Sequence, residues 1–140
     1  MIDLTGNRWI GWMWILFALS NVALFGVYDD AESVLSIEMI EPAIWGLLGV
    51  AGLIGGALYL MKRAVGARLL ASLSRIFGLY CLAAILLRAA FVFLDPGEIY
   101  MEILLVEGSI AVIMIGIGVF FFWVARRLDV VLVSFHEESE

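Results

Sequence analysis

The chain has 140 residues, of which 64% are hydrophobic and 16% are charged, with a net charge of -6 at pH 7 and a mean hydropathy of +1.08. Soluble domains contain about 45–50% apolar residues, so this chain has more apolar surface than a core of its own can bury, which excludes an ordinary soluble domain. A negative chain also lacks the basic surface that nucleic acids require, which excludes nucleic acid as a partner. We therefore predict an all-α integral membrane protein whose main partner is the lipid bilayer.

The first apolar run, residues 9–28, predicts a membrane-spanning helix. Its residues 18–20 resemble the cleavage site of a signal peptide, but the preceding segment carries Asp3 beside Arg8, which is unlike the basic start of such a peptide. We therefore expect the run to be retained as the first span. Asn21 lies near its end, and an amide in lipid favours a hydrogen bond to another helix, worth about 0.6 kcal/mol.

The second predicted span, residues 42–61, begins with Pro42, which suits the first turn of a helix because its missing N–H is not needed there. Residues 33–41 are expected to be helical as well, either along the membrane interface or as part of the span. The span is rich in glycine, which offers a smooth face that another backbone can approach closely. This face predicts packing against another helix of the same chain or, alternatively, against another subunit. It consists of Gly46, Gly49, Gly52, Gly55 and Gly56, with a GxxxG pair at 52 and 56.

The third and fourth spans are predicted at residues 72–93 and 99–124. Residues 66–71 are expected to be an interfacial extension, because a bilayer core needs only about 20 helical residues. Residues 1–127 then form one four-helix transmembrane domain. Residues 128–140 follow as an acidic cytoplasmic tail, with an apolar start on the inner membrane surface and a disordered acidic end.

The charges are sorted by segment, and this sorting predicts the orientation. The segments before the first span, between the second and third, and after the fourth carry basic residues, whereas the other two links carry only acidic ones. The positive-inside rule therefore puts both termini in the cytoplasm (N-in and C-in) of a multi-pass protein of the plasma membrane. The basic residues are Arg8, Lys62, Arg63, Arg68, Arg126 and Arg127, and the acidic ones are Asp29, Asp30, Glu32, Glu38, Glu41, Asp95 and Glu98.

A faint internal repeat is present. Residues 25–32 resemble residues 91–98, 66 positions further on, and the same offset pairs Glu41 with Glu107. A duplication would produce two tandem hairpins of the same orientation, related by an axis along the membrane normal, with the second helix beginning near Ser33. The alternative is coincidence among a few apolar and acidic positions.

Polar residues within the predicted spans are candidates for a functional cluster, which comprises Glu107, Arg88, Glu102 and Asn21. Glu107 lies roughly 13 Å into the fourth span at 1.5 Å per residue. A charge deep in the hydrocarbon costs about 2.5–3.5 kcal/mol unless it is paired, protonated or next to water. Arg88, on the antiparallel third span, is at a depth similar to Glu102 and within reach of Glu107. The prediction is an ion pair that fixes helix register; the alternatives are a carboxylate that handles protons or cations and a contact with a partner subunit. Arg75 is expected to reach the inner headgroups by snorkelling.

Motifs of enzymes and cofactor sites are absent from the sequence: it has no P-loop, no glycine-rich dinucleotide fingerprint and no GxSxG elbow. Cys81 is the only cysteine, so an intramolecular disulfide is impossible, and we expect it to be a small buried apolar residue. His136 stands alone and cannot build a metal or haem site by itself. We expect no cofactor, no metal and no enzymatic activity.

These patterns predict a non-catalytic four-helix membrane protein that acts as a structural or accessory subunit of a membrane assembly. Its partner is expected to be another membrane protein or further copies of the chain in a homo-oligomer. The alternative is a small transporter, or an ion or proton conduit, that uses Glu107. A third and weaker hypothesis is a membrane enzyme that uses the polar residues of the outer half.

Overall fold

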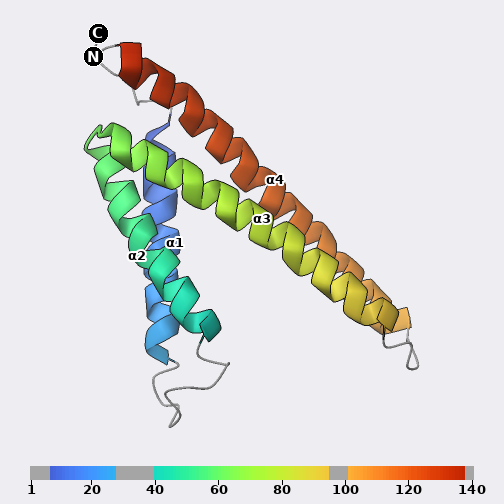
Figure 1. Cartoon of the computed structure of the whole chain (residues 1–140). Helices are drawn as coiled ribbons and strands as arrows, with labels where there is room; N and C mark the ends of the chain where they lie inside the picture. The colour runs from blue at the N-terminus through green and yellow to red at the C-terminus, as the bar shows by residue number, and fades with distance from the viewer. Residues whose placement is uncertain (1–6, 28–39, 95–100, 138–140) are drawn as a thin grey trace. The chain divides into compact units, whose positions relative to one another are not determined.

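The computed structural model describes residues 7–27, 40–94 and 101–137, and the side chains of residues 7–21, 44–90 and 105–135. These residues form an all-α protein with four helices, shown in Figure 1: α1 (Arg8–Val27), α2 (Ile40–Leu60), α3 (Ala64–Leu94) and α4 (Met101–Glu137). The chain divides into two compact units, the first made of Met1–Leu73 and Arg126–Glu140 and the second of Ser74–Ala125.

α1 and α2 cover the predicted spans 9–28 and 42–61 almost completely, whereas α3 and α4 each extend well beyond the predicted span at one end. The predicted interfacial extension 66–71 is part of the continuous helix α3. Beyond residue 127, where the acidic tail is predicted, α4 continues as a helix to Glu137. Residues 125–137 contain neither glycine nor proline, and Leu128 and Val131, one turn apart, are buried, so nothing ends the helix there. Residues 138–140, and the expected helix start near residue 33, lie outside the described residues.

Two of the helices have the length and composition of membrane spans. Among the described residues, the segments Ala64–Ala90 and Leu105–Phe135 are long and apolar enough to cross a membrane, and Ile44–Leu60 is a shorter apolar helix. At 1.5 Å per residue, α3 is about 46 Å long and α4 about 55 Å, so each exceeds the roughly 30 Å of a hydrocarbon core.

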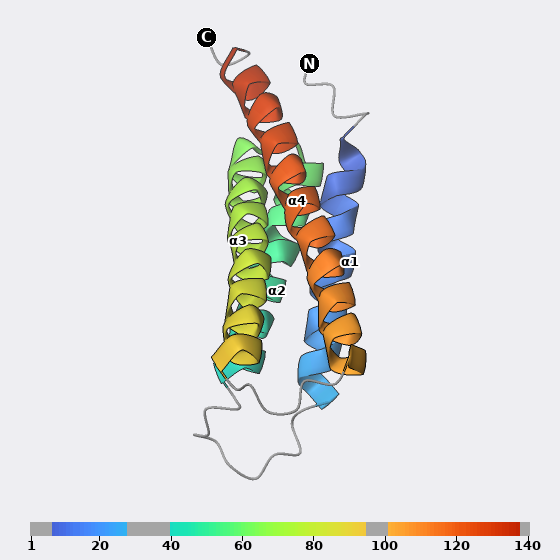
Figure 2. The ribbon, with the colours of Figure 1, turned by 90° about the vertical axis from the view of Figure 1, so that its right-hand side faces the viewer.

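In the first unit, α1 and α2 run side by side in opposite directions, as Figures 1 and 2 show. Their glycines let the two backbones approach closely. A Cβ added to Gly56 would lie 2.9 Å from the carbonyl oxygen of Gly11, and one added to Gly52 would lie 3.1 Å from the ring of Trp14. The Tyr59 hydroxyl also donates a hydrogen bond to the carbonyl oxygen of Asn7 (3.4 Å). The largest fully buried side chains of this unit are Trp14, Tyr59, Ile10, Leu70 and Leu128.

A three-residue link joins α2 to α3, and its hydrogen bonds have the Schellman pattern of a helix C-terminus. The Arg63 N–H donates to the Leu58 carbonyl and the Lys62 N–H to the Tyr59 carbonyl, both at 2.9 Å. Lys62 occupies the left-handed position of this motif, with φ 58°, where glycine is usual. Gly66 in the first turn of α3 lies directly against the backbone of α2, because an added Cβ would meet the Leu58 carbonyl carbon at 2.6 Å.

In the second unit, residues 74–94 of α3 and 101–125 of α4 form an antiparallel hairpin (Figure 2). The rings of Phe77 and Phe121 meet edge to face at 4.6 Å between centroids, which fixes the register of the two helices. Small residues again permit close packing, since a Cβ added to Gly118 would lie 3.5 Å from both the Cβ of Cys81 and the carbonyl oxygen of Gly78.

Candidate functional site

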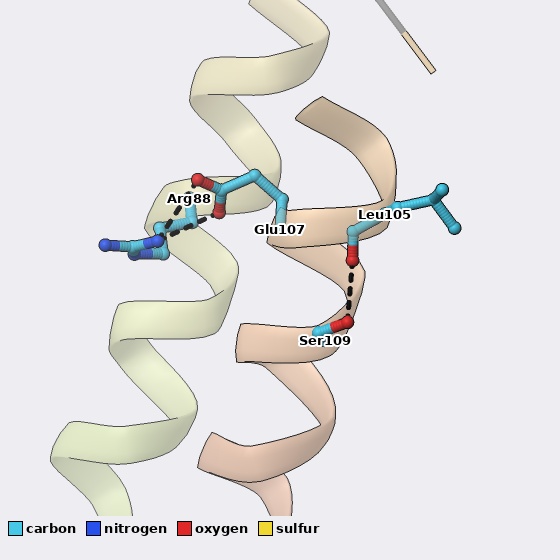
Figure 3. Close-up of polar contacts among 4 residues, drawn as sticks. All are labelled: Arg88, Leu105, Glu107 and Ser109. Carbon is cyan, nitrogen blue, oxygen red and sulfur yellow. Dashed lines mark hydrogen bonds and ion pairs between the residues drawn. The ribbon is translucent and has the colours of Figure 1, made fainter. Parts of the chain in front are cut away.

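The second unit holds the polar contact that links its two helices. Arg88 of α3 donates hydrogen bonds from Nη1 to both carboxylate oxygens of Glu107 on α4, at 2.9 Å to Oε2 and 3.2 Å to Oε1 (Figure 3). Charge-assisted bonds of this length are among the stronger side-chain interactions. The structure therefore brings together the arginine and the carboxylate that the sequence placed on neighbouring spans.

The register of the hairpin explains why these two residues meet. Arg88 lies 11 positions after Phe77, and Glu107 lies 14 positions before Phe121, the ring partner of Phe77. At 1.5 Å per residue these offsets differ by about 4.5 Å along the axis, which the two long side chains can span. The ion pair and the ring contact therefore fix the same register at two different positions along the hairpin.

The ion pair is not enclosed by the protein. The Arg88 side chain is 53% exposed and the Glu107 side chain 33% exposed. The adjacent positions on both helices are exposed and apolar: Leu86, Leu87, Leu105 and Val106. Two residues beyond Glu107, the Ser109 hydroxyl donates to the carbonyl oxygen of Leu105 at 2.8 Å (Figure 3), so it is satisfied within its own helix. The site is a charge pair at an otherwise apolar surface.

The other two members of the predicted polar cluster are not brought to this pair by the described contacts. The Asn21 side-chain amide donates to the carbonyl oxygen of Phe17 in its own helix, at 2.9 Å. The expected hydrogen bond to another helix is therefore not observed for Asn21, because a carbonyl one turn earlier is already within reach. The side chain of Glu102 lies outside the described part of the chain.

The glycine face of α2 is divided between two neighbours within the first unit. Gly52 and Gly56 face α1, as described above, whereas a Cβ added to Gly55 would meet the side chain of Leu70 on α3 at 2.8 Å. Gly49 is buried and Gly46 is partly buried. For the three glycines whose neighbours are described, the close approach is thus made inside the chain, which is one of the two alternatives that the sequence left open.

Two structural features were missed by reasoning from the sequence. Gly66 makes the closest backbone approach described in the first unit, yet a single glycine near a helix start carries no distinctive signal. Ser74 is fully buried, and its hydroxyl has no hydrogen-bond partner among the described residues. A serine in an apolar helix could have been singled out because most buried hydroxyls find a partner.

The described residues contain no group of three or more histidine, cysteine, aspartate or glutamate side chains that could hold a metal ion. Cys81 is a buried free thiol that packs against Gly118. Fold and site together define the class: an all-α protein of four helices, two of them candidate membrane spans, with an ion pair between them. The chain matches no protein-family model, no curated protein and no solved structure.

Proposed function

We propose that this protein is a non-catalytic integral membrane protein that crosses the plasma membrane four times, with both termini in the cytoplasm, and serves as a structural or accessory subunit of a membrane assembly. Residues 1–127 would form the transmembrane domain, which the last turns of α4 extend into the cytoplasm. The hairpin formed by α1 and α2 and the hairpin formed by α3 and α4 would be the two tandem repeats of this domain.

The observation that carries this proposal is the apolar exterior of every helix. Large apolar side chains are exposed on α1 through α4, and Leu47, Leu86 and Val112 are each at least 70% exposed. Water-soluble proteins rarely expose contiguous apolar patches larger than a few hundred Å², so such a surface requires lipid or a partner protein to cover it. Other strongly exposed members of the set are Leu16, Leu19, Ile54, Val65, Leu79, Leu87, Leu105, Ile113 and Val119.

The second unit also offers a consistent membrane register. Phe77 and Phe121 are at one level, so Arg75 and Trp123, each two residues further towards the same end, are level with one another. Arginine and tryptophan both favour the headgroup boundary. From Arg75, Arg88 is 13 residues along α3, about 20 Å at 1.5 Å per residue. The ion pair would then lie inside a hydrocarbon core of roughly 30 Å, nearer to its outer side.

The inner side would be marked by the basic residues. Those in the link between α2 and α3, the one at the start of α3, and those that follow the apolar part of α4 are all exposed, so they can meet anionic headgroups. They are Lys62, Arg63, Arg68, Arg126 and Arg127.

The assembly is tested by crosslinking in native membranes, followed by purification in a mild detergent. We expect a complex larger than the 15.5 kDa chain. A chain that extracts only as a monomer, or that washes from the membrane in alkaline carbonate, would contradict the proposal.

A second candidate function is a proton or cation conduit. It is favoured by the partial exposure of the Glu107 carboxylate, which one side of the hairpin leaves uncovered. Its bonds to Arg88 speak against it, because both carboxylate oxygens already accept hydrogen bonds from Nη1 and are therefore less free to bind a transported ion. The conduit predicts flux into liposomes that Glu107→Gln abolishes while thermal stability is kept.

A further inference from the structure

We propose that a second copy of this chain covers the Arg88–Glu107 pair in a two-fold symmetric interface, in which the Arg88 of each copy also binds the Glu107 of the other. The inference rests on the proposed membrane location, because it is the hydrocarbon that makes an uncovered ion pair costly. It assigns the interface and the partner, which the proposed function leaves open.

The first step is the hydrogen-bonding capacity that the pair leaves unused. A guanidinium has five N–H donors, and those of Arg88 that bond are on Nη1 alone. Among the described residues, Nε and Nη2 of Arg88 have no partner, and Figure 3 shows the far end of the guanidinium pointing away from Glu107. The carboxylate likewise has about four acceptor sites, of which the described contacts occupy two.

The second step is the surroundings of these free groups. The neighbouring exposed side chains, Leu86, Leu87, Leu105 and Val106, offer neither a donor nor an acceptor. In the proposed register this part of the hairpin faces hydrocarbon, where water cannot satisfy polar groups and each unsatisfied group is costly. Whatever covers the pair must therefore supply acceptors for Arg88 and donors for Glu107 at the same place.

The third step is charge complementarity. A phospholipid phosphate supplies acceptors for Arg88, but it would meet the like charge of Glu107, and a free cation would meet the like charge of Arg88. A second copy supplies both signs at once. In a two-fold interface residue i contacts residue j and j contacts i, so a surface that presents one donor group beside one acceptor group is complementary to itself. The four side chains would form a neutral ring of alternating charge.

The shape of α3 allows this approach. Ala84 lies four residues before Arg88 and therefore on the same helix face, one turn deeper. A small, partly buried residue there lets a second helix come close enough for Arg88 to reach across.

The test uses charge reversals in copies with two different fluorescent labels, reconstituted together in vesicles of neutral phosphatidylcholine and followed by energy transfer. Arg88→Glu gives a face with two acidic groups, and Glu107→Arg gives a face with two basic groups. We expect each variant alone to lose at least tenfold in self-association. The two variants mixed should associate about as well as the unaltered chain, and so should the double variant, which carries both reversals. Loss of association by the single variants without recovery in the mixture would overturn the proposal, because an ion pair confined to one chain recovers only in the double variant.

A second measurement does not depend on how well the charge variants fold. In a Cys81→Ala background, Ala84→Cys should form a disulfide between copies in oxidised vesicles. The matched control is Gly116→Cys, nine residues after Glu107 and therefore on the opposite face of α4, where an added Cβ meets nothing within 4 Å. We expect no rapid crosslink from the control. Equal crosslinking at both positions, or none at Ala84→Cys, would overturn the proposed interface.

The same vesicles separate the two proposals. If the unaltered chain resists alkaline carbonate but remains monomeric, the membrane location stands and the two-fold interface is wrong. If the chain is washed out, both are wrong.

Discussion

Gly66 of α3 lies against the backbone of Leu58 of α2 so closely that a methyl group on Gly66 would meet the Leu58 carbonyl carbon at 2.6 Å. Backbone atoms at a helix end cannot turn aside as a flexible side chain can. We therefore expect Gly66→Ala to lower the free energy of unfolding by about 3 kcal/mol, the upper end of the usual overpacking range. Thermal unfolding in detergent, followed by circular dichroism, measures this.

The matched control for Gly66 is Gly116, which is also helical but has open space around the added Cβ. Gly116→Ala should raise stability by about 0.5–1 kcal/mol, because alanine loses less backbone entropy than glycine in a helix. Equal effects of the two substitutions would show that the close approach at Gly66 does not exist.

Two glycines at the α1–α2 contact are expected to differ in how much an alanine substitution lowers stability. At Gly56 an added Cβ meets the backbone oxygen of Gly11 at 2.9 Å, whereas at Gly52 the nearest atom belongs to the Trp14 ring, at 3.1 Å. We expect Gly56→Ala to cost about 2–3 kcal/mol and Gly52→Ala nearer to 1 kcal/mol, since a side chain yields more easily than a backbone. The order of the two melting temperatures is the result to check, and the reverse order would contradict this packing.

Lys62 holds a left-handed conformation in the link between α2 and α3, at φ 58°. A β-branched residue fits that conformation poorly, so Lys62→Ile should lower the unfolding free energy by about 1–2 kcal/mol. Lys62→Gly should leave stability equal or slightly higher, because glycine adopts positive φ without a steric cost. Both variants remove the same charge, so a difference in their melting temperatures does not come from the lost charge.

The ion pair is tested by a double-mutant cycle. Removing one partner leaves an uncompensated charge, and because the pair is partly exposed we expect Glu107→Gln to cost about 1–3 kcal/mol, between the values for surface and buried pairs. Adding Arg88→Met should recover much of that loss. Proton flux is measured on the same preparations. Full stability with abolished flux in Glu107→Gln would favour the conduit over the structural subunit.

Topology is tested by labelling single cysteines in intact cells, starting from Cys81→Ala, which leaves no other cysteine. The positive-inside rule predicts that Met61→Cys is protected from an impermeant reagent and that Gly97→Cys is labelled. Met61 is well exposed on the protein surface, so burial within the chain would not explain its protection. Labelling of Met61→Cys from outside would reverse the proposed orientation.

Apolar run length was sufficient to predict the all-α class and four helices. α1 (Arg8–Val27) and α2 (Ile40–Leu60) cover the predicted spans 9–28 and 42–61 almost completely. The helix α4 runs 13 residues past the predicted end of the fourth span, from 124 to Glu137, because apolar run length describes a membrane span and not the whole helix that contains it. Arg126 and Arg127 mark the predicted inner membrane boundary, and charges at such a boundary do not break a helix.

The partners of the polar residues depended on tertiary structure. The sequence put Arg88 within reach of Glu107, but only the hairpin register, set by Phe77 against Phe121, shows that they meet and how much of the pair stays uncovered. It could not show that Asn21 bonds within its own helix, because a local carbonyl and a distant helix compete for the same amide. The sequence also could not distinguish Gly66 from the other glycines. Close approach depends on where a second backbone segment lies, and a local sequence pattern does not describe that second segment.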